Sequence, residues 1–134
     1  IVARYDTDRG VWVPLSSSVN LTDNSVTAQV NHFSTFQLMQ ASPASSFDQV
    51  KVFPNPFRPS QGHQAITLAN LLSESVVRIY NLSGELIKEL TASSAGLASW
   101  NGLTEKGESS ASGVYLAYCE SGSQRKTVKF VIQR

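Results

Sequence analysis

Short stretches in which apolar and polar residues alternate recur along the whole chain. Gly, Pro, Asn and Ser separate them, and no stretch carries apolar residues at helical spacing for three turns. Alternation with a period of two is typical of strands that bury one face. The pattern predicts strands over residues 1–6, 10–15, 25–30, 34–40, 49–54, 64–69, 75–82, 85–91, 96–102, 113–120 and 126–133. We therefore predict an all-β chain built around a sandwich.

A change of composition at "ASPASSFD", residues 41–48, divides the chain in two. Small and polar residues with a proline predict a linker, because they offer little to bury. Residues 1–40 hold only four predicted strands, too few for a stable core of their own. They are predicted to be the C-terminal part of an upstream β-domain, or else to pack on the second part. Residues 49–134 are long enough to fold alone.

Turn residues give the second part its predicted connections. In "NLSGEL", Gly84 can adopt positive φ and so favours a hairpin. The three prolines of "PNPFRP" exclude a central strand and predict an extended segment at an edge. We expect Phe53 and Phe57, which flank the first two prolines, to anchor this segment in the core.

Composition narrows the functional classes. The 134 residues include 11 basic and 10 acidic side chains, for a net charge of +1. This balance argues against a nucleic-acid or anionic-membrane surface, which needs a basic excess on one face. Cys119 is the single cysteine, which excludes a disulfide within the chain and predicts a core or edge residue. No run approaches the roughly 18 apolar residues of a membrane span.

The start of the chain predicts that it is part of a longer protein. Its first residue is not Met, no signal peptide is present, and a predicted strand begins at once. We therefore expect the chain to come from the C-terminal end of a larger polypeptide.

No cofactor or metal site is predicted from the sequence. The segment "DTDRG", Asp6 to Gly10, has some features of a calcium loop but lacks its later ligands, so a β-turn is the favoured interpretation. His32 and His63 lie far apart in sequence with no Cys or carboxylate at ligand spacing. We expect no cofactor, no metal and no enzymatic activity.

The second part resembles a known C-terminal module. The segments "VKVFPNPFRP", "VVRIYNLSGELIKEL", "WNGLTEKGESSASGVYLAY" and "KTVKFVIQR" follow one another in the order found in sorting domains of type IX secretion substrates. The same order is similar to the related immunoglobulin-like domain named after the flagellar hook-capping protein FlgD. The "WNG" at Trp100 to Gly102 fits the flagellar variant better.

This resemblance implies an immunoglobulin-like β-sandwich at the end of an exported bacterial protein. The implied partners are the outer-membrane secretion machinery, a surface sortase and upstream domains of the same polypeptide; the implied location is secreted or on the cell surface. The residues matching the sorting motif are Pro54, Asn55, Pro56, Gly84, Gly113, Tyr115 and Lys126. These residues either shape the fold or form the recognised surface. Lys126, Lys129 and Arg134 form either a basic contact or a solvated strand face.

The first part contains "HFSTFQL", which has two interpretations. With the preceding "VWVPL", it resembles the end of β-domains in ankyrin, netrin receptors and the death-domain protein PIDD. In PIDD-like relatives such a site cleaves itself, which would make Ser34 the nucleophile, the Phe33 carbonyl the target and His32 the base. The alternative is a strand in which His32, Ser34, Phe36 and Leu38 share the core side.

Three functions follow from these patterns. The first is a non-catalytic C-terminal module for secretion sorting or surface anchoring. The second is a structural or adhesive spacer in an extracellular protein. The third is a β-domain that cleaves itself between Phe33 and Ser34.

Overall fold

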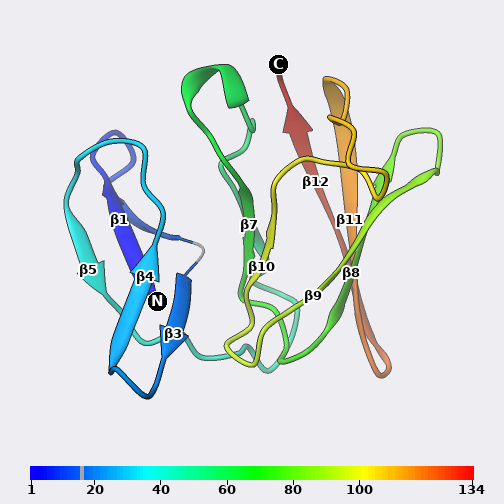
Figure 1. Ribbon diagram of the computed structural model, residues 1–134. Coiled ribbons are helices and arrows are strands. Elements are labelled where there is room, and N and C mark those ends of the chain that lie inside the picture. Colours follow the sequence, from blue (N-terminus) through cyan, green and yellow to red (C-terminus); the bar gives the residue numbers. More distant parts are fainter. Residues whose placement is uncertain (16) are drawn as a thin grey trace. The chain divides into compact units, whose positions relative to one another are not determined.

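The computed structural model describes residues 1–15 and 17–134, which form two compact units, Ile1–Ala41 and Ser42–Arg134 (Figure 1). Both units are built from antiparallel sheets, which confirms the all-β prediction. The second unit also contains a one-turn 3₁₀ helix, η1 (Pro59–Gln61). The strands are β1 (Val2–Asp6), β2 (Val11–Pro14), β3 (Ser17–Asn20), β4 (Ser25–Ala28), β5 (Phe36–Leu38), β6 (Lys51–Phe53), β7 (Ile66–Ala69), β8 (Val76–Asn81), β9 (Leu86–Thr91), β10 (Ala98–Trp100), β11 (Gly113–Ser121) and β12 (Gln124–Ile132).

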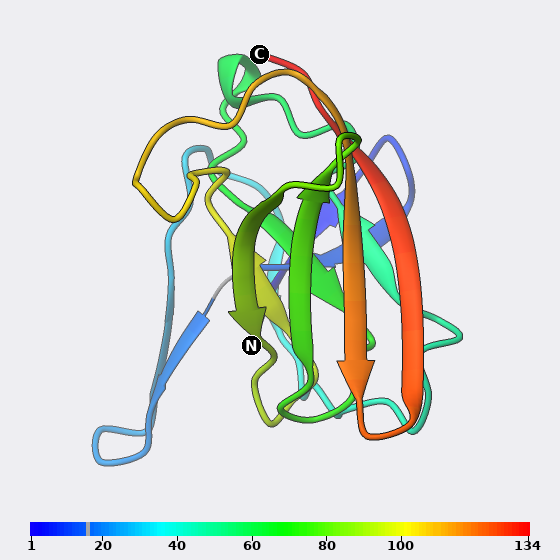
Figure 2. The same cartoon turned by 90° about the vertical axis from the view of Figure 1, so that its right-hand side faces the viewer.

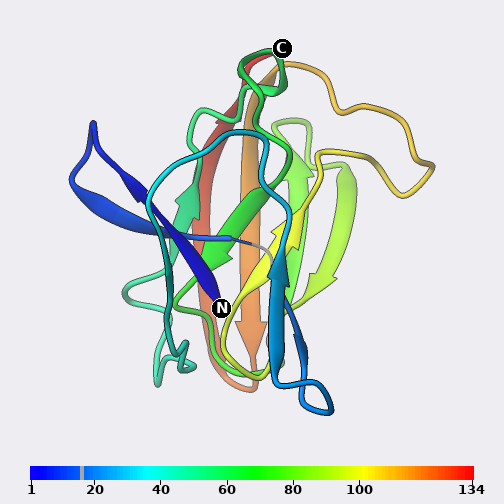
Figure 3. The same cartoon turned by 60° about the vertical axis from the view of Figure 1, so that its left-hand side comes forward.

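The first unit contains a sheet of order β2-β1-β5 and a separate β3–β4 hairpin (Figure 3). The β1–β2 turn confirms the turn interpretation of Asp6–Gly10. Asp6 Oδ1 accepts hydrogen bonds from the backbone N–H groups of Asp8 and Arg9, each at 3.1 Å. Ala3 is the one apolar side chain of this unit that is buried among the described residues.

Strand β3 was not predicted, because Ser17–Asn20 shows little apolar alternation. It forms because it pairs with β4 in a continuous register from Ser17 opposite Ala28 to Asn20 opposite Ser25. The connecting turn is fixed by the Asn20 side chain, whose Oδ1 accepts from Thr22 N at 2.9 Å. Local turn chemistry, and not a buried face, therefore forms this hairpin.

The strand predicted over residues 34–40 is shorter than expected, and its predicted core face is wrong. β5 begins at Phe36, so His32 and Ser34 precede the strand. On the predicted core face, Leu38 is 66% exposed and only Phe36 is partly buried. The alternation is present in the sequence, but this small unit buries little apolar surface, so the face stays largely exposed.

The second unit is a β-sandwich of two antiparallel sheets, of order β10-β7-β6 and β12-β11-β8-β9. Figure 2 shows the four-stranded sheet face on, with β9, β8, β11 and β12 side by side. Alternate residues of its strands point into the core, and Val77, Ile79, Ala117 and Cys119 are fully buried. From the opposite sheet, Ile66 and Leu68 of β7 complete this core together with Trp100 of β10.

Residues 42–48, expected to bury little, belong to the second unit. Phe47 is 3% exposed and joins its core, and Ala44 N donates to Leu71 O at 2.9 Å. A single aromatic side chain can remove a large apolar area from water. The small and polar residues of this segment therefore gave no sign that Phe47 belongs to the core.

Candidate functional site

The segment carrying Pro54, Asn55 and Pro56 is bonded to the end of strand β12. Asn55 Oδ1 accepts from Val131 N at 3.0 Å, Phe57 N donates to Val131 O at 2.8 Å, and Gln133 N donates to Phe57 O at 2.8 Å. Phe57 and Ile132 are partners in a parallel bridge. The prolines end β6 and direct the chain across to the other sheet, as the edge prediction required.

Phe57 is the anchor of this segment. Its side chain is 1% exposed, whereas Phe53 is only partly buried, so the predicted anchoring is confirmed for Phe57. The Phe57 ring stacks on His63 with centroids 6.2 Å apart. His63 Nδ1 accepts from Arg58 N at 2.8 Å, and Arg58 Nε donates to the Gln133 side chain at 2.8 Å.

The loop of residues 101–112 closes over the same place. Arg134 donates from Nε to Ser110 O and from Nη2 to Gly102 O, the latter at 3.3 Å, and its backbone N–H donates to Ser112 Oγ at 2.9 Å. Gly102 has φ +79°, and a Cβ there would lie 3.0 Å from Phe57 Cε1. Only glycine fits such a close approach at this φ. We call residues 55–58, 101–113 and 131–134 the clamped end.

Three aromatic rings fill the core beneath the clamped end. Tyr115 stacks on Phe130 at 5.9 Å and meets Trp100 edge-on at 6.2 Å. The Tyr115 hydroxyl donates to Ala111 O at 2.7 Å, and Trp100 Nε1 donates to Leu103 O at 2.7 Å. A tyrosine bonded to the backbone just upstream also fixes a corner in immunoglobulin-type sandwiches. Burial raises the pKa of Tyr115, which keeps its hydroxyl protonated and able to donate.

The structure brings most of the predicted motif residues to one end of the sandwich. Asn55 and Gly113 belong to the clamped end, and Tyr115 lies directly beneath it. The β8–β9 hairpin, with Gly84 at φ +83°, lies at this end too, since Asn81 pairs with Tyr115. Gly84 adopts the predicted positive φ.

Lys126 lies away from the other motif residues. It pairs with Cys119, toward the opposite end of the β11–β12 ladder. Lys126 and Lys129 are an odd number of residues apart in β12, so their side chains leave opposite faces of the sheet. Arg134 is occupied by the 101–112 loop. The three cations therefore do not form one basic face.

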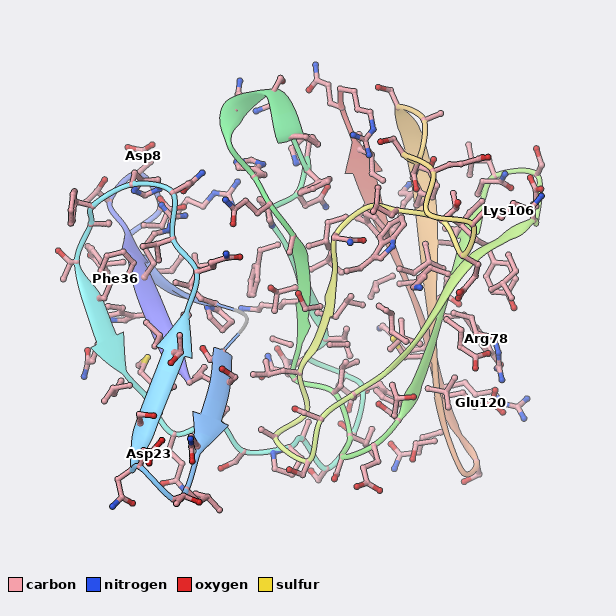
Figure 4. All side chains as sticks on the ribbon, viewed as in Figure 1. Asp8, Asp23, Phe36, Arg78, Lys106 and Glu120 are labelled. Carbon is pink, nitrogen blue, oxygen red and sulfur yellow. The ribbon has the colours of Figure 1, made fainter. Side chains whose placement is uncertain are left out.

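Sequence reasoning missed a charged network on the outer face of the four-stranded sheet. Arg78 bonds Glu89 at 3.0 Å and Glu120 at 3.1 Å, and Arg125 lies 3.5 Å from Glu120. Figure 4 shows Arg78 and Glu120 together on that side of the sheet. The two glutamates raise the pKa of Arg78. Arg78 and Glu120 lie 42 residues apart in sequence, and only the strand register makes them neighbours.

The first unit places His32, Phe33 and Ser34 in an exposed segment. His32 Nδ1 lies 3.2 Å from Phe33 O, and Ser34 Oγ donates to Tyr5 O at 3.4 Å. The imidazole thus contacts the oxygen of the carbonyl that the predicted reaction attacks, while the hydroxyl is bonded elsewhere. Self-cleavage stays a prediction.

The remaining candidate groups are the single cysteine and the possible metal ligands. Cys119 is fully buried in the core, as predicted, and burial raises its pKa to about 11. Among the described residues, no three His, Cys, Asp or Glu side chains are grouped so that they could hold a metal ion. Within residues 1–15 and 17–134, no helical segment has the length and apolar character needed to cross a bilayer.

Comparison with protein families decides the affiliation. Residues 51–133, most of the sandwich, match the model of the secretion system C-terminal sorting domain. The chain belongs to this family. Its second unit is therefore a sorting domain.

One solved structure supports the same affiliation. It is PorZ, described as an essential bacterial surface component of the type-IX secretion system of Porphyromonas gingivalis. The similarity has 31% sequence identity and a TM-score of 0.60, and it covers 68% of this chain. The chain spans only 12% of the length of that protein. A search of curated proteins found no match.

Proposed function

We propose that the sandwich of residues 42–134 is a type IX export signal that is read as a folded surface and not as a linear peptide. The family match and the similarity to PorZ support this function. The observation that supports recognition of a folded surface is that the motif residues are held in place by contacts within the fold. Asn55 is bonded to Val131 N, and Tyr115 is buried and bonded to Ala111 O, so unfolding would destroy the arrangement.

We assign the motif residues different roles within this proposal. Asn55, Gly84 and Gly113 are exposed near one end of the sandwich and would contact the outer-membrane secretion machinery. Tyr115 would position that end from within the core, together with Pro54 and Pro56, which direct the chain between sheets. Lys126, toward the other end of its ladder, would contribute to a separate contact along β12.

The proposal extends to the fate of the protein. A surface sortase would remove the domain after export, leaving the cargo secreted or attached to the outer membrane of a bacterium. The first unit exposes several large apolar side chains, including Leu21 at 84% and Val19 at 58%. An upstream domain of the same polypeptide that completes this unit would cover them, as expected for the ankyrin-like resemblance. The FlgD-type affiliation likewise stays a prediction.

A reporter fusion tests the export function. A periplasmic reporter joined upstream of residues 1–134 is produced in a bacterium with a type IX system and in a mutant lacking that system. We expect the reporter in the medium or on the surface only in the first strain. A Phe57→Ala fusion, which empties a buried aromatic site, should stay in the periplasm, while Leu21→Ala, at an exposed residue outside the sandwich, should be exported.

Two outcomes favour the alternative functions. A reporter that stays in the periplasm of the competent strain would indicate a structural or adhesive spacer. Mass spectrometry of the purified chain tests self-cleavage, because hydrolysis before Ser34 would yield two fragments whose masses sum to the intact mass plus one water. A single intact mass would refute cleavage.

A further inference from the structure

The four-stranded sheet has one edge that is closed by its own chain. At β9, Glu105 N donates to Ile87 O at 3.2 Å, and Glu89 N donates to Glu105 Oε1 at 3.1 Å. Lys88 Nζ adds a bond to the same carboxylate at 3.3 Å. Covering an edge in this way prevents unwanted pairing with another strand.

The opposite edge, β12, is closed only near its end. Val131 and Gln133 direct their backbone groups away from β11, since they bond to Asn55 and Phe57. The β11–β12 register runs without a bulge from Ile132 to Gln124. In an antiparallel ladder, alternate residues point both backbone groups to the same side. Residues 125, 127 and 129 therefore also direct their N–H and C=O groups outward.

These outward groups have no backbone partner in the part of the chain that the structure describes. Arg125, Thr127 and Lys129 are exposed. Gln124 Nε2, which donates to Ser45 O at 3.4 Å, marks the lower limit of the open stretch, and Asn55 marks the upper one. By contrast, the edge strands of the other sheet, β6 and β10, are only three residues long.

The charged side chains of residues 125–129 determine which kind of strand can pair with this edge. Arg125, Lys126 and Lys129 are cations on this stretch, and only Arg125 is placed against a carboxylate, Glu120, in the described structure. Lysines on an edge strand disfavour pairing with a second copy, because like charges would face each other. The same lysines attract a strand of opposite charge. An open ladder with a basic border is therefore complementary to an extended acidic segment.

We propose that residues 125–129 of β12 receive an extended acidic segment of a partner protein as an additional strand. Backbone hydrogen bonds to residues 125, 127 and 129 would hold the segment, and Lys129, which leaves the same outer face of the sheet as Arg125, would select its charge. The identity of that partner as part of the export machinery rests on the proposed function. The binding site itself does not.

A matched pair of substitutions at Thr127 tests the site. Thr127→Pro removes the outward N–H but spares the β11–β12 ladder, because that N–H points away from β11. Thr127→Ala keeps the N–H and serves as the control. The probe is a synthetic peptide that alternates glutamate with valine, compared with a peptide in which lysine replaces glutamate. Binding to the full chain is followed by NMR.

The proposal expects a specific pattern. The acidic peptide slows amide exchange at Arg125, Thr127 and Lys129, and the lysine peptide does not. Thr127→Pro weakens binding by about tenfold or more, as for the loss of a backbone hydrogen bond, while Thr127→Ala binds like the parent. Lys129→Glu, which leaves the backbone intact, also weakens binding and provides a second test if Thr127→Pro fails to fold.

Equal binding by all variants, or protection of amides elsewhere than at β12, would overturn the proposal. Its failure is distinguishable from failure of the proposed function. Export of the wild-type fusion without peptide binding would refute the edge site alone. Peptide binding without export would refute the sorting role alone.

Discussion

Two glycines with the same backbone conformation separate the cost of positive φ from the cost of a close approach. Gly102 and Gly107 both have φ +79°. A Cβ at Gly107 would meet nothing within 4 Å, whereas one at Gly102 would lie 3.0 Å from Phe57 Cε1 and 3.3 Å from Arg134 Nη2. Alanine at Gly107 therefore measures the backbone cost alone.

The expected magnitudes differ accordingly. Left-handed backbone costs a residue with a Cβ roughly 1–2 kcal/mol, so Gly107→Ala should lower the free energy of unfolding by about that much. Forcing a methyl group into a packed site adds about 1–3 kcal/mol. Gly102→Ala should therefore cost about 2–5 kcal/mol, and Phe57 and Arg134 should shift if the domain still folds.

Urea unfolding of the two variants, followed by tryptophan fluorescence, gives both values. Trp100 reports on the clamped end, and a Trp12→Phe background removes the signal of the first unit. If Gly102→Ala lowers the free energy of unfolding no more than Gly107→Ala does, the reasoning is refuted. That result would show that Phe57 and Arg134 can move aside without destabilising the domain.

Three further predictions follow from individual contacts. Tyr115→Phe keeps both ring contacts but removes the bond to Ala111 O, so urea unfolding should show a loss of about 1 kcal/mol; no loss would mean that the hydroxyl does not fix the corner. Cys119, buried and with its pKa raised to about 11, should resist a thiol reagent at pH 8 until urea unfolds the chain; rapid labelling in buffer would contradict the buried core position. The bonds from Glu89 N and then Lys88 lower the pKa of Glu105, so its stabilisation is present above the ordinary value of 4.5 and lost as pH falls through the lowered value. Thermal melts should therefore separate wild type from Glu105→Gln at pH 7 and converge in acid; a constant difference would be incompatible with this linkage.

The second unit could be predicted largely from local patterns. Alternation in β8, β11 and β12 arises from residues that face the core, and its period is visible in the sequence. Gly84 was predictable because a hairpin needs positive φ, and Phe57 because prolines beside an aromatic residue suggest an anchored edge. The resemblance to sorting domains rests on the same residues.

Features that depend on register or on distant partners could not be predicted. Glu105 closes the β9 edge, and Arg134 reaches back to Gly102, but neither side chain carries a local signal of its partner. Phe47 was hidden among small polar residues. β3 lacked alternation because it forms a hairpin without a buried face. In each case the deciding interaction joins segments whose pairing the linear pattern does not encode.

The position of β12 in the order of synthesis has a consequence for quality control. The ribosome makes this strand after all the others of the sandwich, yet β12 supplies Phe130 and Ile132 to the core and holds the segment around Asn55. A polypeptide that terminates prematurely therefore cannot assemble the domain. If export requires the assembled domain, aborted translation products are retained and left to proteases, and only completed cargo leaves the cell.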